Sequence, residues 1–93
     1  MSVRVRIPAP LRRLTRGEDS VAFEAGDLSH CVEALEAQFP GMKERLCDES
    51  GELRRFVNVF VNGEDVRFLE GLATPLKDGD EVSIVPAVAG GTR

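Results

Sequence analysis

The sequence contains no tryptophan and no tyrosine, a single histidine and only two cysteines. Cys31 and Cys47 form no CxxC motif and only His30 stands near them, so neither a disulfide framework nor a metal site is predicted. No apolar run approaches the roughly 20 residues of a membrane-spanning helix, and no signal peptide opens the chain. We therefore expect a cytoplasmic protein with no metal, no membrane contact and no catalytic residue of its own.

Basic residues are outnumbered, with 12 Lys and Arg against 16 Asp and Glu and a net charge of −4 over 93 residues. This balance argues against general nucleic-acid binding, and the length indicates one domain. The first sixteen residues nevertheless hold five arginines and no acid. We expect either a solvated hairpin at a sheet edge or a basic docking patch for an acidic protein partner, formed by Arg4, Arg6, Arg12, Arg13 and Arg16.

Four segments alternate apolar and polar side chains with the two-residue period of a half-buried strand. They are SVRVRIP at 2–8, VAFEA at 21–25, FVNVFVNG at 56–63 and EVSIVPAV at 81–88. The polar stretch between the first two predicts a turn and therefore a hairpin. Asn62-Gly63 is a turn signal, after which DVRFL at 65–69 is interpreted as a short return strand.

One segment has the helical period instead. Asp27 is a suitable N-cap, and apolar side chains then recur at helical spacing over 28–39. Pro40-Gly41 ends this helix, and 42–46 adds one more turn. The long connection at 70–80 is expected to be anchored on the core by three leucines, Leu69, Leu72 and Leu76.

The predicted order is strand, strand, helix, strand, short strand, strand. A hairpin followed by a helical crossover predicts the β-grasp, or ubiquitin-like, fold: α+β, with a mixed sheet of four to five strands and one main helix packed on one face. In that arrangement the last strand lies beside the first, in mid-sheet. We expect this domain to span 1–89 and a tail to occupy 90–93.

The tail contains two adjacent glycines, Gly90 and Gly91. Without a Cβ they form a narrow chain that is free in φ and can thread a slot that rejects side chains. A terminal glycine carboxylate in such a slot can attack the α-phosphate of ATP, and a sulfur nucleophile can then displace AMP to leave a thiocarboxylate. The partner must supply the electrostatic stabilisation, because the carrier contributes no acid or base to the reaction.

Several motifs resemble those of the ubiquitin-like sulfur carriers, the ThiS and MoaD family. DGDEV at 78–82 and the diglycine are shared by the wider family, whereas RFVNVFVNGEDVRF at 55–68 and PAVAGG at 86–91 are similar to its CysO-like branch. The resemblance implies that a ubiquitin-activating-like enzyme adenylates Gly91 with ATP and that sulfur is installed there as a thiocarboxylate. It also implies two further partners, a cysteine-synthase-like enzyme with pyridoxal phosphate and a JAMM-type metalloprotease with zinc. Those cofactors belong to the partners and not to this chain.

The sequence departs from the CysO-like pattern after Gly91, because Thr92 and Arg93 follow. A peptide carbonyl cannot be adenylated as a carboxylate can, and a β-branched threonine blocks a glycine-width slot. Resemblance to related carriers that a JAMM-type protease trims implies a precursor that is cut between Gly91 and Thr92. The alternative is a permanently blocked tail that marks a protein other than a carrier.

Alternation places Arg4, Arg6, Phe60 and Val85 on the sheet face away from the helix, together with Asn58 and Ser83. An apolar centre with a charged rim is typical of an interface, so Arg4, Arg6, Phe60 and Val85 are partner-interface candidates. In the alternative interpretation, Phe60 only folds over the sheet.

Two other functions stay open at this point: a MoaD-like small subunit of molybdopterin synthase and a ubiquitin-like protein modifier. Both also require a free terminal glycine. We expect the protein alone to be a monomer, and Cys31 to be a small core residue while Cys47 lies in a polar loop.

Overall fold

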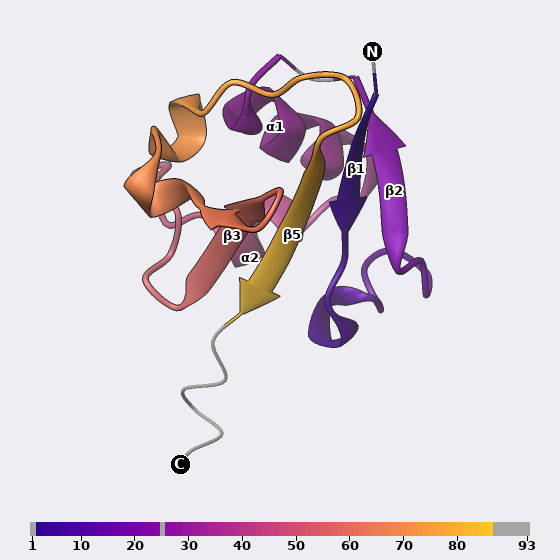
Figure 1. Ribbon diagram of the computed structural model, residues 1–93. Coiled ribbons are helices and arrows are strands. Elements are labelled where there is room, and N and C mark those ends of the chain that lie inside the picture. Colours follow the sequence, from indigo (N-terminus) through magenta and orange to yellow (C-terminus); the bar gives the residue numbers. More distant parts are fainter. Residues whose placement is uncertain (1, 25, 87–93) are drawn as a thin grey trace.

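The structure, a computed structural model, describes residues 2–24 and 26–86. Five strands form one sheet with the order β2-β1-β5-β3-β4. The last strand runs parallel to the first and antiparallel to β3, so the prediction that it lies in mid-sheet beside the first strand is confirmed (Figure 1). The strands are β1 (Val3–Arg6), β2 (Ser20–Phe23), β3 (Val57–Val61), β4 (Glu64–Asp65) and β5 (Glu81–Pro86).

Two helices, α1 (Leu28–Gln38) and α2 (Met42–Leu46), cover one face of the sheet (Figure 1). As predicted, Asp27 is the N-cap of α1, where its Oδ1 accepts a hydrogen bond of 2.8 Å from the backbone N–H of His30. The carboxylate of Glu36 accepts the backbone N–H of Lys43 at 2.9 Å. A side chain of α1 therefore satisfies an end of α2 that has no side-chain cap of its own.

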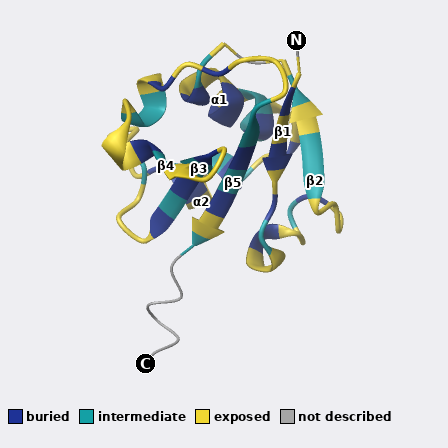
Figure 2. Cartoon of the chain, viewed as in Figure 1, coloured by how far each residue is buried: buried dark blue, intermediate teal, exposed yellow. Residues whose placement is uncertain are grey.

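The core forms where the alternating strand faces meet the apolar stripe of α1 (Figure 2). Each of the three long strand patterns buries its predicted face, and the interspersed residues are partly or fully exposed. The buried strand residues are Val3, Val5, Val57, Val59, Val61, Val82 and Ile84, and those of α1 are Leu28, Cys31, Val32 and Leu35. The β-grasp prediction is thus confirmed at the level of packing as well as topology.

A short return strand follows Asn62-Gly63 and pairs with β3 as predicted, but its predicted bounds, 65–69, are wrong. The strand β4 occupies Glu64–Asp65 only, and a 3-10 helix, η2 (Val66–Phe68), follows. Asp65 accepts the backbone N–H of Arg67 at 2.9 Å, which turns the chain and sends Val66 into the core with 0% exposure. After this turn Leu69 remains 40% exposed, so it is not the anchor we expected, whereas Leu76 is buried.

The polar stretch after β1 is also more than a hairpin turn. It contains a 3-10 helix, η1 (Ala9–Leu11), and it buries both Leu11 and Thr15. The Thr15 hydroxyl lies 2.8 Å from the carbonyl of Glu18 and 3.1 Å from that of Arg12. Because the hydrogen bonds of the buried Thr15 hydroxyl are satisfied, this segment can pack against the core.

Candidate functional site

The candidate site is the end of β5, from which the chain continues toward the diglycine. Gly90, Gly91 and Thr92 lie outside the described residues, so their predicted roles stay predictions. The structure does place the strand that leads to them. Pro86 is paired with Val57 of β3, and residues 81–83 of β5 are paired with β1 on the other side. The sheet therefore fixes the position of Pro86 through β3, while β1 holds the first half of the strand.

Arg4, Arg6, Phe60 and Val85 lie together on the sheet face opposite the helices, as their alternation predicts. The guanidinium of Arg6 lies 3.5 Å from the carboxylate of Glu81. Val85 is 44% exposed, whereas Phe60 is half-buried, in agreement with a phenyl ring that folds over the sheet. The face therefore offers a small apolar area with charged residues around it, and its contact with a partner stays a prediction.

The sequence analysis did not single out two exposed aromatic residues in the segments on either side of β3. Phe68 is 88% exposed and Phe56 is 58% exposed. Phe56 was assigned to the outward face of its strand but not singled out, whereas Phe68 was hidden in the wrongly assigned return strand. Recognising Asp65 as a cap would have predicted that Phe68 follows a turn and faces solvent.

Arg67 connects η2 to the beginning of β3. Its Nη1 donates to the Oδ1 of Asn58 at 2.6 Å, and its Nη2 donates to the carbonyls of Val57 at 2.8 Å and Arg54 at 2.9 Å. All of these acceptors are neutral. This guanidinium is therefore held against the beginning of β3, the strand whose Val57 and Asn58 pair with the last residues of β5.

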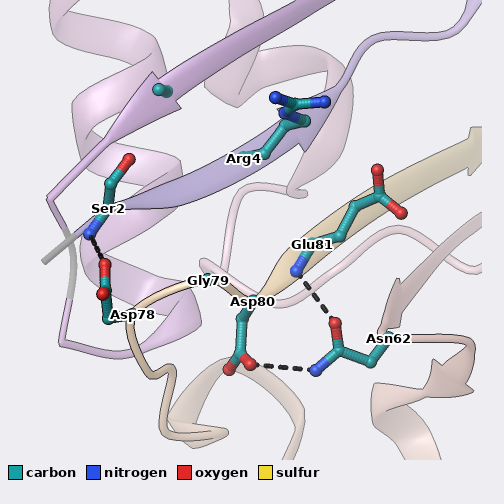
Figure 3. A pocket seen from close by; sticks show the side chains of 8 residues that line it. Ser2, Arg4, Asn62, Asp78, Gly79, Asp80 and Glu81 are labelled. Atoms are coloured by element: carbon teal, nitrogen blue, oxygen red, sulfur yellow. Dashed lines mark hydrogen bonds between the residues drawn. The ribbon is translucent and has the colours of Figure 1, made fainter.

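The DGDEV motif lies at the other end of β5, where it lines a hollow (Figure 3). The Oδ1 of Asp78 accepts the backbone N–H of Ser2 at 2.6 Å, and the Oδ1 of Asp80 accepts the Nδ2 of Asn62 at 2.9 Å. The Oδ1 of Asn62 in turn accepts a hydrogen bond of 3.0 Å from the backbone N–H of Glu81. These acids join the start of β5 to its neighbours, so they hold the strand in position instead of forming a reactive site near the diglycine.

The pKa of Asp80 predicts how stability depends on pH. The backbone N–H of Lys77, and then the side chain of Asn62, hold this pKa below its ordinary value of 3.8. A lowered pKa means that the contribution to stability is present above the unfolded value and is lost as pH falls through the folded value. We expect the free energy of unfolding to fall between about pH 5 and pH 2 and to fall less steeply in Asp80→Asn. Urea titrations of both proteins across this range test it, and equal slopes would contradict it.

Both cysteines are buried, Cys31 with 0% and Cys47 with 4% exposure. Burial raises the pKa of the Cys31 thiol to about 11 and also raises that of Cys47. Cys31 is a core residue as predicted, but the expectation that Cys47 lies in a polar loop is wrong, because Cys47 closes α2 and joins the core. Within residues 2–24 and 26–86 there is no group of three or more side chains suited to hold a metal, and no helix long and apolar enough to cross a membrane.

Comparison with known proteins gives consistent matches. A model of the ThiS family matches residues 5–91. The chain is 53% identical over 93 residues to the sulfur carrier protein CysO of Mycobacterium tuberculosis, a match that covers 98% of this chain and 100% of that protein. It is 39% identical over 94 residues to small archaeal modifier protein 3 of Haloferax volcanii, with coverage of 98% and 100%. A chain in the crystal structure of the Amycolatopsis orientalis BexX/CysO complex superposes with a TM-score of 0.90 at 47% identity, covering 96% of this chain and 99% of that chain.

Proposed function

We propose, from the premise that this chain belongs to the ThiS family and is a sulfur carrier of the CysO type, that the sulfur is carried on the carbonyl carbon of Gly91. The observation that supports this most directly is the extent of the family match, which includes both glycines and reaches residue 91. Partner enzymes bind the folded domain and thereby position this carbonyl.

The proposed chemistry has two steps. The Gly91 carboxylate attacks the α-phosphorus of ATP, which releases pyrophosphate and forms an acyl adenylate. A sulfur nucleophile then attacks the acyl carbon and AMP leaves, so that a thiocarboxylate remains. A ubiquitin-activating-like enzyme supplies the stabilisation of the charge that develops, because the described part of this chain brings no acid–base pair to the end of β5.

Gly91 must be freed before these steps, since its carbonyl is in a peptide bond with Thr92 in this sequence. We propose that a JAMM-type zinc protease cleaves the bond between Gly91 and Thr92. The sheet face with Arg4, Arg6, Phe60 and Val85 is the proposed contact surface for the partners, because these residues share one face and lead to the end of β5.

Cysteine is the proposed product of the carried sulfur, and one experiment tests this. The chain ending at Gly91 is loaded with sulfur and incubated with O-acetylserine or O-phosphoserine and a pyridoxal-phosphate cysteine synthase. The thiocarboxylate attacks an aminoacrylate, and an S-to-N acyl shift leaves cysteine in amide linkage to Gly91. We expect the product to be heavier than the unloaded chain by one cysteine residue, and the same protein without sulfur to gain nothing. Tight binding to the large subunit of molybdopterin synthase without any cysteine adduct would favour the MoaD-like role instead.

A ubiquitin-like modifier is the second candidate, and the 39% identity to small archaeal modifier protein 3 favours it specifically. A modifier forms an isopeptide bond between Gly91 and a lysine of another protein, whereas a carrier delivers sulfur and is released. Protease digestion of proteins from the native cell distinguishes them. Lysines that carry a remnant of the tail indicate a modifier, and a chain recovered only in free or cysteine-linked form indicates a carrier.

A further inference from the structure

Arginines from two distant parts of the sequence gather around the end of β5, although the protein as a whole is acidic. One group lies in the segment after β1, and the other lies just before β3 and in η2. Because β5 is parallel to β1 and antiparallel to β3, the end of β1 and the beginning of β3 both lie at the Pro86 end of the sheet (Figure 1). We call these six exposed residues the arginine collar: Arg12, Arg13, Arg16, Arg54, Arg55 and Arg67.

Half of the collar is held in place by neutral acceptors. The Nε of Arg12 donates to the carbonyl of Ile7 at 3.0 Å, and the Nε of Arg54 donates to the carbonyl of Glu44 at 2.9 Å. Arg67 is held by carbonyls and by the Asn58 amide oxygen. Bonds to neutral groups orient a guanidinium and leave its positive charge uncompensated.

The collar also lacks ion pairs in the described part of the chain, where the three pairs are Arg6–Glu81, His30–Asp27 and Lys43–Glu33. No collar arginine therefore forms an ion pair within the described residues, although Arg54 lies close enough to Asp48 to help lower the pKa of that carboxyl. The charges of the other five remain available to a group outside the protein. Three of the six are already oriented, which lowers the entropy that binding would cost.

Acidic residues occupy the opposite end of β5. Asp78, Asp80 and Glu81 line the hollow there, and Glu64 lies on the neighbouring strand β4. Arg4 also lines this hollow and Arg6 pairs with Glu81, so the acids where β5 begins are only partly uncompensated, and the charge asymmetry comes mainly from the arginines at the other end. Such an asymmetry orients a protein as it approaches a charged surface and raises the association rate.

We propose that the arginine collar docks on an acidic protein surface around the entrance of the slot that receives the tail. This rests on the proposed function, since it assumes that an enzyme accepts Gly91. The collar attracts the acidic rim while the Asp78–Asp80 end is repelled from it, so the diglycine arrives first. The apolar side chains of Phe56 and Phe68, exposed beside Arg55 and Arg67, provide contact area once the charges have met.

Association kinetics with BexX of Amycolatopsis orientalis, which has been crystallised in a complex with CysO, test the proposal. We expect Arg13→Gln and Arg55→Gln each to lower the association rate constant about two- to fivefold at low salt, and the double variant about tenfold. Neither side chain makes a hydrogen bond within residues 2–24 and 26–86, so the variants should fold normally. Lys77→Gln removes the same charge at the opposite end and is expected to leave the rate nearly unchanged.

The proposal would be overturned if the arginine variants associated as fast as the Lys77→Gln variant. It would also be overturned if the association rate of the unsubstituted chain did not fall with added salt. A complete lack of association at low salt would overturn it as well. Sulfur loading is measured separately. A chain that is loaded at Gly91 but associates independently of salt overturns only the collar, and one that associates as expected but never accepts sulfur overturns only the carrier function.

Discussion

A chain ending at Gly91 is expected to gain one sulfur in exchange for oxygen when it is incubated with ATP, sulfide and an adenylating enzyme of a ThiS-type carrier, and the chain ending at Arg93 is expected to gain none. The difference should be all or none, because adenylation requires a carboxylate and the second protein has a peptide carbonyl at Gly91. Intact-protein mass spectrometry measures the exchange directly.

A third protein, ending at residue 91 but with Gly91→Val, is the matched control. It has a free carboxylate but a β-branched side chain, which a glycine-width slot should exclude. We expect its loading to fall by at least about a hundredfold, as misplacement of a reacting atom by about 1 Å can cause. Equal loading of the chains ending at Gly91 and Arg93 would show that Gly91 is not the acceptor.

Leu35→Ala is expected to lower the free energy of unfolding by about 3 kcal/mol, the usual cost of removing a buried leucine side chain. Leu35 lies on the inner side of α1 with 1% exposure, where it packs in the core beneath the sheet. A small domain has about 5 to 15 kcal/mol in total, so this change removes a large part of it. Denaturant unfolding measures the loss, with the exposed Gln38→Ala on the same helix as the control. A loss below about 1 kcal/mol would contradict the assignment of Leu35 to the core.

The elements that the sequence predicted well are those in which local pattern and burial agree. In β1 and β3 every second residue is apolar and buried, and in α1 the cap at Asp27 and the apolar stripe coincide. The position of β5 followed from the order of elements, because a hairpin and a helical crossover leave the centre of the sheet for the last strand.

The errors came from single side chains that redirect the backbone. Asp65 binds the backbone of Arg67 and ends β4 after two residues, although DVRFL alternates well enough to be a strand. Thr15 satisfies its hydroxyl within its own loop and becomes buried, which composition alone does not reveal. Cys47 is buried because α2 and the segment before β3 meet around it, a contact between parts of the chain that no local pattern encodes.

The same distinction applies to the candidate site: one part follows from local sequence and the other from tertiary structure. The diglycine and its chemistry could be predicted from the sequence, because they depend on residue type and order alone. The arginine collar could not, because Arg13 and Arg55 are 42 positions apart in the sequence and come to the same end of the sheet only through the pairing of β1, β5 and β3. Phe68 became visible as an exposed residue only once η2 had replaced the expected strand.

The burial of Cys31 and Cys47 gives the protein a convenient chemical property. The anionic form of sulfur attacks an alkylating reagent such as iodoacetamide and displaces iodide, and here both thiols are shielded and hard to deprotonate. The proposed thiocarboxylate on Gly91, in contrast, would be anionic at neutral pH. Brief labelling of the native protein should therefore count loaded molecules alone, and the same labelling in denaturant should add two further labels as an internal standard.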